Sequence, residues 1–231
     1  MKKTLLAYGF FLSVNVFGQF NVKVAVPSYL SDSDIYLYSF NGSKEILQSK
    51  AKFSNNVATF KVDKAYKGML RAFFKKSASS VNMVSENKDI SFKIELDSKN
   101  KISNVIFDDE VNKLFSYQAD IQKKQDLILP ALIQIKDYYT TSDSFYKSLD
   151  SEINLLSKND TSAYEAYPFL SFYSKNQKFS QQEKVAEIKS QDFIDFFSKS
   201  GEYLETSIIL KPALVNFLYV STSNLDGNVY Q

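Results

Sequence analysis

Hydrophobic and polar residues alternate in short runs along the first half of the chain. The runs that show this period of two lie at 20–26, 34–40, 57–62, 69–74, 81–84 and 90–96. They are rich in β-branched and aromatic residues, and turn-forming pairs such as Pro27-Ser28 separate them. Successive side chains of a strand point to opposite faces, so the pattern predicts roughly six to eight half-buried strands. Short strands at such close spacing favour an antiparallel β-sandwich or an open barrel.

The hydrophobic period then changes to that of a helix. Apolar residues recur at helical spacing in the segments 111–121, 127–135, 145–156, 164–173, 181–189, 191–198 and 201–220. Pro130 is expected to kink or split the second of these segments, and Pro168 weakens the fourth. The fold class is therefore expected to be α+β, with an antiparallel β-sandwich or open barrel followed by a helical half. A signal peptide, a β-sandwich-like domain and a helical domain are expected at 1–18, 19–107 and 108–231.

The start of the chain has the pattern of a secretory signal peptide. Lys2 and Lys3 supply a positive charge, and residues 5–16 form an apolar run that is broken only by small or weakly polar residues. The run is shorter than the roughly 20 residues that span a bilayer, although a short anchor or a buried strand would be alternatives. We expect export to the periplasm or cell envelope of a Gram-negative bacterium, with cleavage near Gly18-Gln19.

Charge gives no indication of a nucleic-acid partner. The 231 residues carry a formal net charge of +2, and loss of Lys2 and Lys3 would lower the number of basic residues from 28 to 26, equal to the acidic ones. Nucleic-acid binding needs a basic surface, which a balanced chain does not supply overall. The other adjacent basic pairs, Lys75-Lys76 and Lys123-Lys124, are expected to lie on the solvated surface.

The chain contains neither cysteine nor histidine. Its own side chains therefore supply no thiol nucleophile, disulfide, Cys/His zinc site or imidazole base, and no cysteine for lipid attachment. Phosphate-binding glycine loops and a GxSxG nucleophile motif are also missing from the sequence. Carboxylates remain as the main acid–base groups, with Tyr and Lys as weaker ones. We expect a non-enzymatic protein with no catalytic, metal-binding or cofactor-binding residues.

Two acidic clusters could in principle bind a cation. Asp108-Asp109-Glu110 lies where the last strand gives way to the first helix, and there Asp109 is expected to act as the N-cap. Asp32-Ser33-Asp34 resembles part of a calcium loop but lacks the glycine and the distal glutamate of that motif. It is expected to be a polar turn between strands.

Aromatic residues are the other candidate binding groups. The chain has 15 Tyr and 20 Phe but no Trp. They gather as Tyr36/Tyr38/Phe40, Tyr138-Tyr139, Phe145-Tyr146, Phe169/Phe172/Tyr173 and Phe193/Phe196/Phe197. Exposed rings bind sugars and peptides, whereas rings at strand or helix spacing usually form the core. Most clusters are expected in the core, and binding by an exposed one stays open.

Six stretches of the chain occur in the same order as similar stretches in a known protein family. They are Phe17-Gly18-Gln19, Ile35-Tyr36-Leu37-Tyr38, Lys67-Gly68-Met69-Leu70-Arg71-Ala72-Phe73, Ile90-Ser91-Phe92-Lys93-Ile94, Asp192-Phe193-Ile194-Asp195-Phe196-Phe197 and Tyr203-Leu204-Glu205-Thr206-Ser207. In this order of loose hydrophobic patterns, the chain resembles the N-terminal region of exported thioredoxin-like proteins related to thiol–disulfide oxidoreductases and peroxiredoxin-type reductases. In that family a signal peptide precedes a β-rich domain of unknown function, a helical segment, and a thioredoxin fold with a Cys-x-x-Cys pair.

The resemblance would cover nearly the whole mature chain, but it transfers no catalytic residue. Gln231 falls before the redox domain of the family, so the chain is expected to be a natural short form or a truncated product. The leading hypothesis is an exported, non-catalytic binding or scaffold module. Its partner would be a protein or envelope component, bound by an exposed aromatic patch or an unpaired sheet edge.

Two alternatives stay open. The chain could be a partner subunit or fragment of a thiol–disulfide oxidoreductase, which the resemblance implies. It could also be a glycan-acting enzyme that uses carboxylates alone. Such an enzyme would place two acidic side chains about 5 to 10 Å apart across a cleft.

Overall fold

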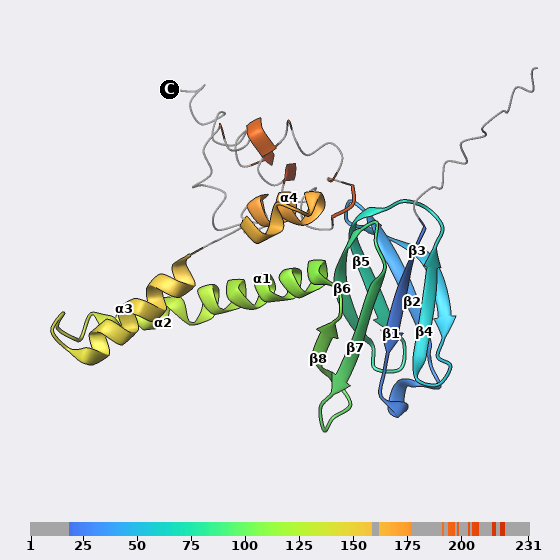
Figure 1. Ribbon diagram of the computed structural model, residues 1–231, viewed down its shortest axis with the longest axis horizontal. Coiled ribbons are helices and arrows are strands. Elements are labelled where there is room, and N and C mark those ends of the chain that lie inside the picture. The colour runs from blue at the N-terminus through green and yellow to red at the C-terminus, as the bar shows by residue number, and fades with distance from the viewer. Residues whose placement is uncertain are drawn as a thin grey trace, which may run out of the picture.

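The computed structural model describes residues 19–158, 162–176 and several single residues and short pieces between 191 and 219. In this part of the chain, strands come first and helices follow (Figure 1). The strands are β1 (Phe20–Ala25), β2 (Asp34–Asn41), β3 (Lys44–Lys52), β4 (Val57–Val62), β5 (Lys67–Phe74), β6 (Ser79–Glu86), β7 (Ile90–Leu96) and β8 (Ile102–Phe107). The α-helices are α1 (Glu110–Leu127), α2 (Leu129–Lys136), α3 (Ser144–Ser157) and α4 (Pro168–Asn176), and the 3-10 helices are η1 (Ser28–Leu30) and η2 (Ser162–Tyr164).

The strands form two four-stranded sheets that pack face to face. One has the order β4-β1-β7-β8 and the other β3-β2-β5-β6. This confirms the α+β class and the sandwich-like first half. The neighbouring strands are antiparallel except β1 and β7, which are parallel. Alternation along a strand indicates which residues face the core but not the direction of the neighbouring strand, so this one parallel pair was not expected.

The main hydrophobic core lies between the two sheets. In β1 the side chains of Phe20, Val22 and Val24 are buried, whereas Asn21 and Lys23 between them are exposed. The same alternation recurs in β4 and β7, where it was expected, and places one apolar row of each strand in the core. Burial of these rows supplies the hydrophobic stabilisation, which is about 1.5–3 kcal/mol for each large side chain.

A second core lies on the outer face of the sheet β3-β2-β5-β6. Phe40, Met69 and Val84 point away from the main core and pack with Val111 of α1 and Leu170 of α4. In Figure 1, α4 lies above α1 beside the upper end of β6. The helical half therefore completes the fold by covering part of one sheet.

Residues near 206 are joined to this sheet by main-chain hydrogen bonds. The N–H of Met69 donates to the carbonyl of Thr206 (2.8 Å), and the N–H of Gly42 donates to the carbonyl of Glu205 (2.8 Å). The Tyr66 hydroxyl donates to the carbonyl of Met69 at 2.7 Å, and burial raises its pKa to about 12. The stretches 67–73 and 203–207, which carry part of the family resemblance, therefore lie in contact.

Local signals placed some helix boundaries correctly and missed others. Asp109 is the N-cap of α1, and its side chain accepts a hydrogen bond from the N–H of Asn112. Pro130 lies in the first turn of α2, and α1 and α2 are separate helices there, as predicted. Pro168 does not weaken a helix from inside, since it is the first residue of α4, where proline is tolerated. The helix expected at 164–173 therefore begins later than predicted, and Tyr164 belongs to the short 3-10 helix η2.

The distal end of α1, with α2 and α3, projects from the sandwich as an arm (Figure 1). No α2 side chain is fully buried. Among the described residues, no helix is both long enough and apolar enough to cross a membrane. The expected signal peptide and the expected helix at 181–189 lie outside the described residues, as does most of the segment 201–220.

Candidate functional site: a cleft at the free edge of strand β6

A cleft of about 560 Å³ lies between β6, β8 and α1. Val81 and Phe107 from the strands and Phe115 from α1 give it apolar walls, whereas Ser80 and Asn82 of β6 add polar groups. The two strands belong to different sheets and stand at the side of the sandwich from which α1 leaves (Figure 1). Apolar walls with a few polar groups are typical of binding sites.

The cleft is bordered by two strand edges. Among the described strands, β6 pairs only with β5, and β8 pairs only with β7, so each is the outer strand of its sheet. Outer strands carry main-chain donors and acceptors that no neighbouring strand satisfies. A ligand that enters the cleft therefore meets main-chain hydrogen-bonding groups as well as side chains.

Asn112 already occupies one position on the β6 edge. Its Oδ1 accepts a hydrogen bond from the N–H of Val84 at 2.7 Å, and its Nδ2 donates to the carbonyl of Val84 at 2.9 Å. A neighbouring strand would satisfy the same two main-chain groups in the same way. The buried amide of Asn112 thus replaces one strand residue and attaches α1 to the sheet.

The next positions on this edge are open to the cleft. In an antiparallel pair, the main-chain groups of successive residues point alternately to one neighbour and to the other. Because Val84 directs its N–H and carbonyl toward α1, Asn82 and Ser80 direct theirs to the same side, away from β5. Both residues line the cleft. The Asn112 contact therefore continues along β6 as a short unpaired edge.

Two further side chains hold the base of α1 in place. The Asp109 carboxylate accepts hydrogen bonds from the N–H of Asn112 and from its Nδ2, both at 2.9 Å. Gln118 lies further along α1 and accepts a hydrogen bond from the Ser174 hydroxyl of α4 at 2.7 Å. Burial raises the pKa of Asp109, although the bonds from Asn112 oppose the shift. These contacts give the cleft a fixed wall on the α1 side.

Glu86 at the end of β6 positions α4. Its Oε1 accepts a hydrogen bond from the N–H of Leu170 at 2.9 Å, in the first turn of α4. Helix N-termini stabilise negative charge because their free N–H groups point outward. The side chain is only 8% exposed, and its Oε2 has no hydrogen-bond partner among the described residues. Burial therefore raises the pKa of Glu86, against the effect of Leu170, Phe169 and two lysines.

Replacing Glu86 by glutamine is expected to alter how stability depends on pH. Burial raises the pKa of Glu86 above its unfolded value of about 4.3, so its contribution to stability is full below that value and is lost as pH rises through the folded pKa. Glutamine does not titrate and keeps an oxygen for the N–H of Leu170. The free energy of unfolding of Glu86→Gln relative to the unchanged chain should therefore increase as pH rises from 4.

Urea denaturation at a series of pH values measures this difference. The matched control is Glu152→Gln, which makes the same replacement at an exposed position of α3. The difference in unfolding free energy between Glu86→Gln and the unchanged chain could instead stay constant or fall between pH 4 and 7. That result would contradict the claim that burial disfavours the charged form of Glu86.

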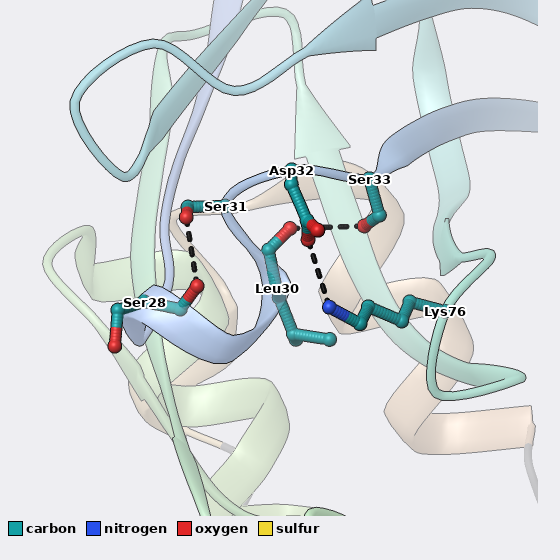
Figure 2. Close-up of polar contacts among 6 residues, drawn as sticks. All are labelled: Ser28, Leu30, Ser31, Asp32, Ser33 and Lys76. Carbon is teal, nitrogen blue, oxygen red and sulfur yellow. Dashed lines mark hydrogen bonds and ion pairs between the residues drawn. The ribbon is translucent and has the colours of Figure 1, made fainter.

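The acidic clusters of the sequence have structural roles. Asp32 pairs with Lys76 at 2.8 Å beside a turn in which the Ser33 hydroxyl donates to the carbonyl of Leu30, as Figure 2 shows. Asp34 pairs with Lys50 at 2.9 Å. Asp32 and Ser33 thus lie in a polar turn that leads into β2 at Asp34, as predicted, and Asp109 is a helix cap. Among the described residues, no three acidic side chains gather in a way that could hold a metal ion.

The arrangement of carboxylates bears on the glycan-enzyme alternative. The described lining of the cleft contains no acidic residue. A separate hollow of about 140 Å³ is lined by Glu86, Asp89, Asp109 and Glu110, among others. The carboxylate of Glu86 accepts a hydrogen bond from the N–H of Leu170, and that of Asp89 accepts one from the N–H of Asn21. The carboxylate of Asp109 accepts one from the N–H of Asn112. Glu86 therefore joins β6 to α4, Asp89 makes a contact within the β half, and Asp109 caps α1.

Aromatic clusters divide between core and surface. Phe40, Phe169 and Tyr173 are buried, as expected for most of them. Tyr173 also lines the cleft, and burial raises its pKa to about 12. In contrast, Tyr138 is 87% exposed on the arm. Phe196 is buried, and its predicted neighbours Phe193 and Phe197 lie outside the described residues.

A scan of the chain against models of protein families finds no match, and a search of curated proteins finds no matching relative. What the chain does must therefore be inferred from its own side chains and geometry. The groups that define the cleft were not singled out by the sequence pattern. Asn112 is an ordinary polar residue of a predicted helix, Ser80 directly precedes the predicted strand 81–84, and no local signal marks either.

Proposed function

We propose that the chain is an exported, non-catalytic module that binds an extended segment of a partner protein by adding it as a strand to β6. The observation that carries the proposal is the contact of Asn112 with both main-chain groups of Val84, because it stands where a neighbouring strand would stand. The bound segment would pair with Asn82 and Ser80 in the cleft. Strand addition of this kind draws affinity from main-chain hydrogen bonds and specificity from alternate side chains.

The lining of the cleft indicates the composition of the segment. One face of the added strand would meet Val81 and Phe107, which belong to the core between the sheets, and the other face would meet Phe115 of α1 on the outer side. A segment of about five residues with apolar side chains toward both faces fits this lining. Because no acidic residue lines the described cleft, its walls do not select a basic peptide.

A single proline on β6 is expected to abolish most of this binding. The probe is the tightest binder from a library of displayed linear peptides, selected on the full chain. Asn82→Pro removes the N–H that would donate to the peptide, and proline is tolerated on outer strands. The bond is lost, and the peptide carbonyl that would accept it is left without a donor. The Kd measured by calorimetric titration should therefore rise about tenfold or more.

The matched control is Asn82→Ala. It removes the same side chain, including its bond to Arg71, but keeps the main-chain N–H. Its Kd should stay within about twofold of the original value. Equal binding by Asn82→Pro and the unchanged chain, or equal losses in both variants, would show that the β6 edge is not the binding element. Circular dichroism of both variants checks that the fold is retained.

Export and kinship to thioredoxin-like proteins are also part of the proposal. The signal-like start of the sequence supports export, and recovery of the chain from the cytosol with Met1 intact would contradict it. In this view the chain is an accessory module of such proteins, and the extended segment belongs to a protein of the envelope.

A further inference from the structure

A stripe of exposed apolar side chains runs along the arm. Its members recur from the end of α1 along α2 and into the turn that follows α2, and the ring of Phe145 in α3 joins the stripe at its far end, against Tyr139. They are Leu127, Ile128, Ala131, Ile135, Tyr138, Tyr139 and Phe145. Hydrogen bonds from Ile128 to Lys124 and from Leu132 to Ile128 continue the helical path through the junction of α1 and α2. The stripe is therefore one continuous surface, and it contains no charged residue.

The stripe is highly exposed for apolar side chains. Leu127 is 67% exposed, Ile135 is 42% exposed and Tyr138 is 87% exposed. Ile128, Tyr139 and Phe145 are between 42% and 49% exposed. At about 150–250 Å² for each large side chain, the exposed area is roughly 600 Å². This is at the upper end of the range for the largest apolar patch of a typical monomeric protein, and such patches are often functional.

We infer that the stripe is the interface of a homodimer, in which two arms pack side by side in opposite directions. Two copies would bury about 1,200 Å² in total, which is at the low end of specific protein interfaces. An uncharged stripe requires an uncharged partner surface of similar length, and a second copy supplies one. The arm projects from the sandwich, so the sandwich does not block its approach (Figure 1).

Side-chain size explains the opposite directions. The far end of the stripe carries three rings, and Tyr139 and Phe145 pack edge to face with centroids 4.9 Å apart. The near end carries Ile128 and the small Ala131. Antiparallel pairing places the rings of one copy over the small and aliphatic end of the other. Large side chains then pack against smaller ones at both ends of the interface. A two-fold axis through the middle of α2 generates both contacts from one surface.

Sedimentation velocity on the full chain tests this inference. We expect a reversible dimer with a Kd of roughly 1–100 µM, as for a small interface. Ile135→Glu places a charge in the middle of the stripe, close to the same charge of the second copy. It should raise the Kd by about 100-fold or more, so that the chain sediments as a monomer.

Leu155→Glu is the matched control. Leu155 is 62% exposed on α3 but lies outside the stripe, and its replacement should leave the Kd within about twofold. An unchanged chain that is monomeric at the highest concentration would overturn the inference, whether or not it binds lipid vesicles through the same residues. A dimer that Ile135→Glu does not weaken would also overturn it. Binding of the selected peptide by Ile135→Glu should be unchanged, since β6 is not part of the stripe.

Discussion

Gly68→Ala is expected to destabilise the protein by at least about 3 kcal/mol. A Cβ at this position would lie 2.4 Å from the Cβ of Thr206 and 2.7 Å from its carbonyl oxygen. The backbone φ of Gly68 is +152°, a value that residues with a side chain rarely adopt. Rotation of a flexible side chain can relieve neither the close contacts with Thr206 nor the unfavourable backbone angle. Relief requires that the main chain at 205–207 move away from β5, which would break the bond from Met69 to Thr206.

Urea denaturation of Gly68→Ala and Gly42→Ala measures this effect with an internal comparison. Gly42 also has a positive φ, of 57°, so its replacement by alanine should cost about 1–2 kcal/mol from backbone strain. The difference between the two variants reports the close approach to Thr206. Equal losses of unfolding free energy would mean that 205–207 does not lie against β5 as described.

Asn112→Ala is expected to cost about 3 kcal/mol of unfolding free energy. The change leaves the N–H and the carbonyl of Val84 buried without partners, and each such group costs roughly 1–3 kcal/mol. The residue is fully buried, so water cannot replace its amide without rearrangement of α1. The N-cap bond from the main-chain N–H of residue 112 to Asp109 is retained, which confines the loss to the side chain.

Asn104→Ala provides the comparison for this second variant. Asn104 also donates from Nδ2 to another side chain, Glu95, but on the exposed surface of β8. Its replacement should change the free energy of unfolding by less than about 0.5 kcal/mol. Should Asn112→Ala lose no more than Asn104→Ala, the attachment of α1 to the β6 edge would not be the strong contact that the geometry indicates.

The sequence predicted those strands that bury one face against the other sheet. β1, β4 and β7 were identified because their apolar residues alternate with polar ones. β3 was missed because it is an outer strand, with nearly all its side chains exposed, and its place is fixed by main-chain pairing with β2. β8 was missed for a similar reason, since only Phe107 of this outer strand is buried. Hydrophobic patterning reports burial and gives no signal for main-chain pairing.

The candidate site was predictable only where its signals are local. Asp109 could be identified as a cap because the cap and the start of the helix are adjacent in sequence. The bonds from Asn112 to Val84 and from Leu170 to Glu86 join residues 28 and 84 positions apart. No pattern within a single helix or strand contains such pairs. The cleft itself follows from which strands end up outermost, and strand order is a property of the tertiary fold.

Amide hydrogen exchange at Ser80 and Asn82, with and without the selected peptide, tests strand addition most directly. Both N–H groups face the cleft without a partner among the described strands, so they should exchange rapidly in the free chain. Pairing with an added strand should slow their exchange by about 100-fold or more, since each N–H would then be hydrogen-bonded and shielded from water. A bound peptide that leaves both amides exchanging at their free rates, and protects residues elsewhere, would contradict strand addition at β6.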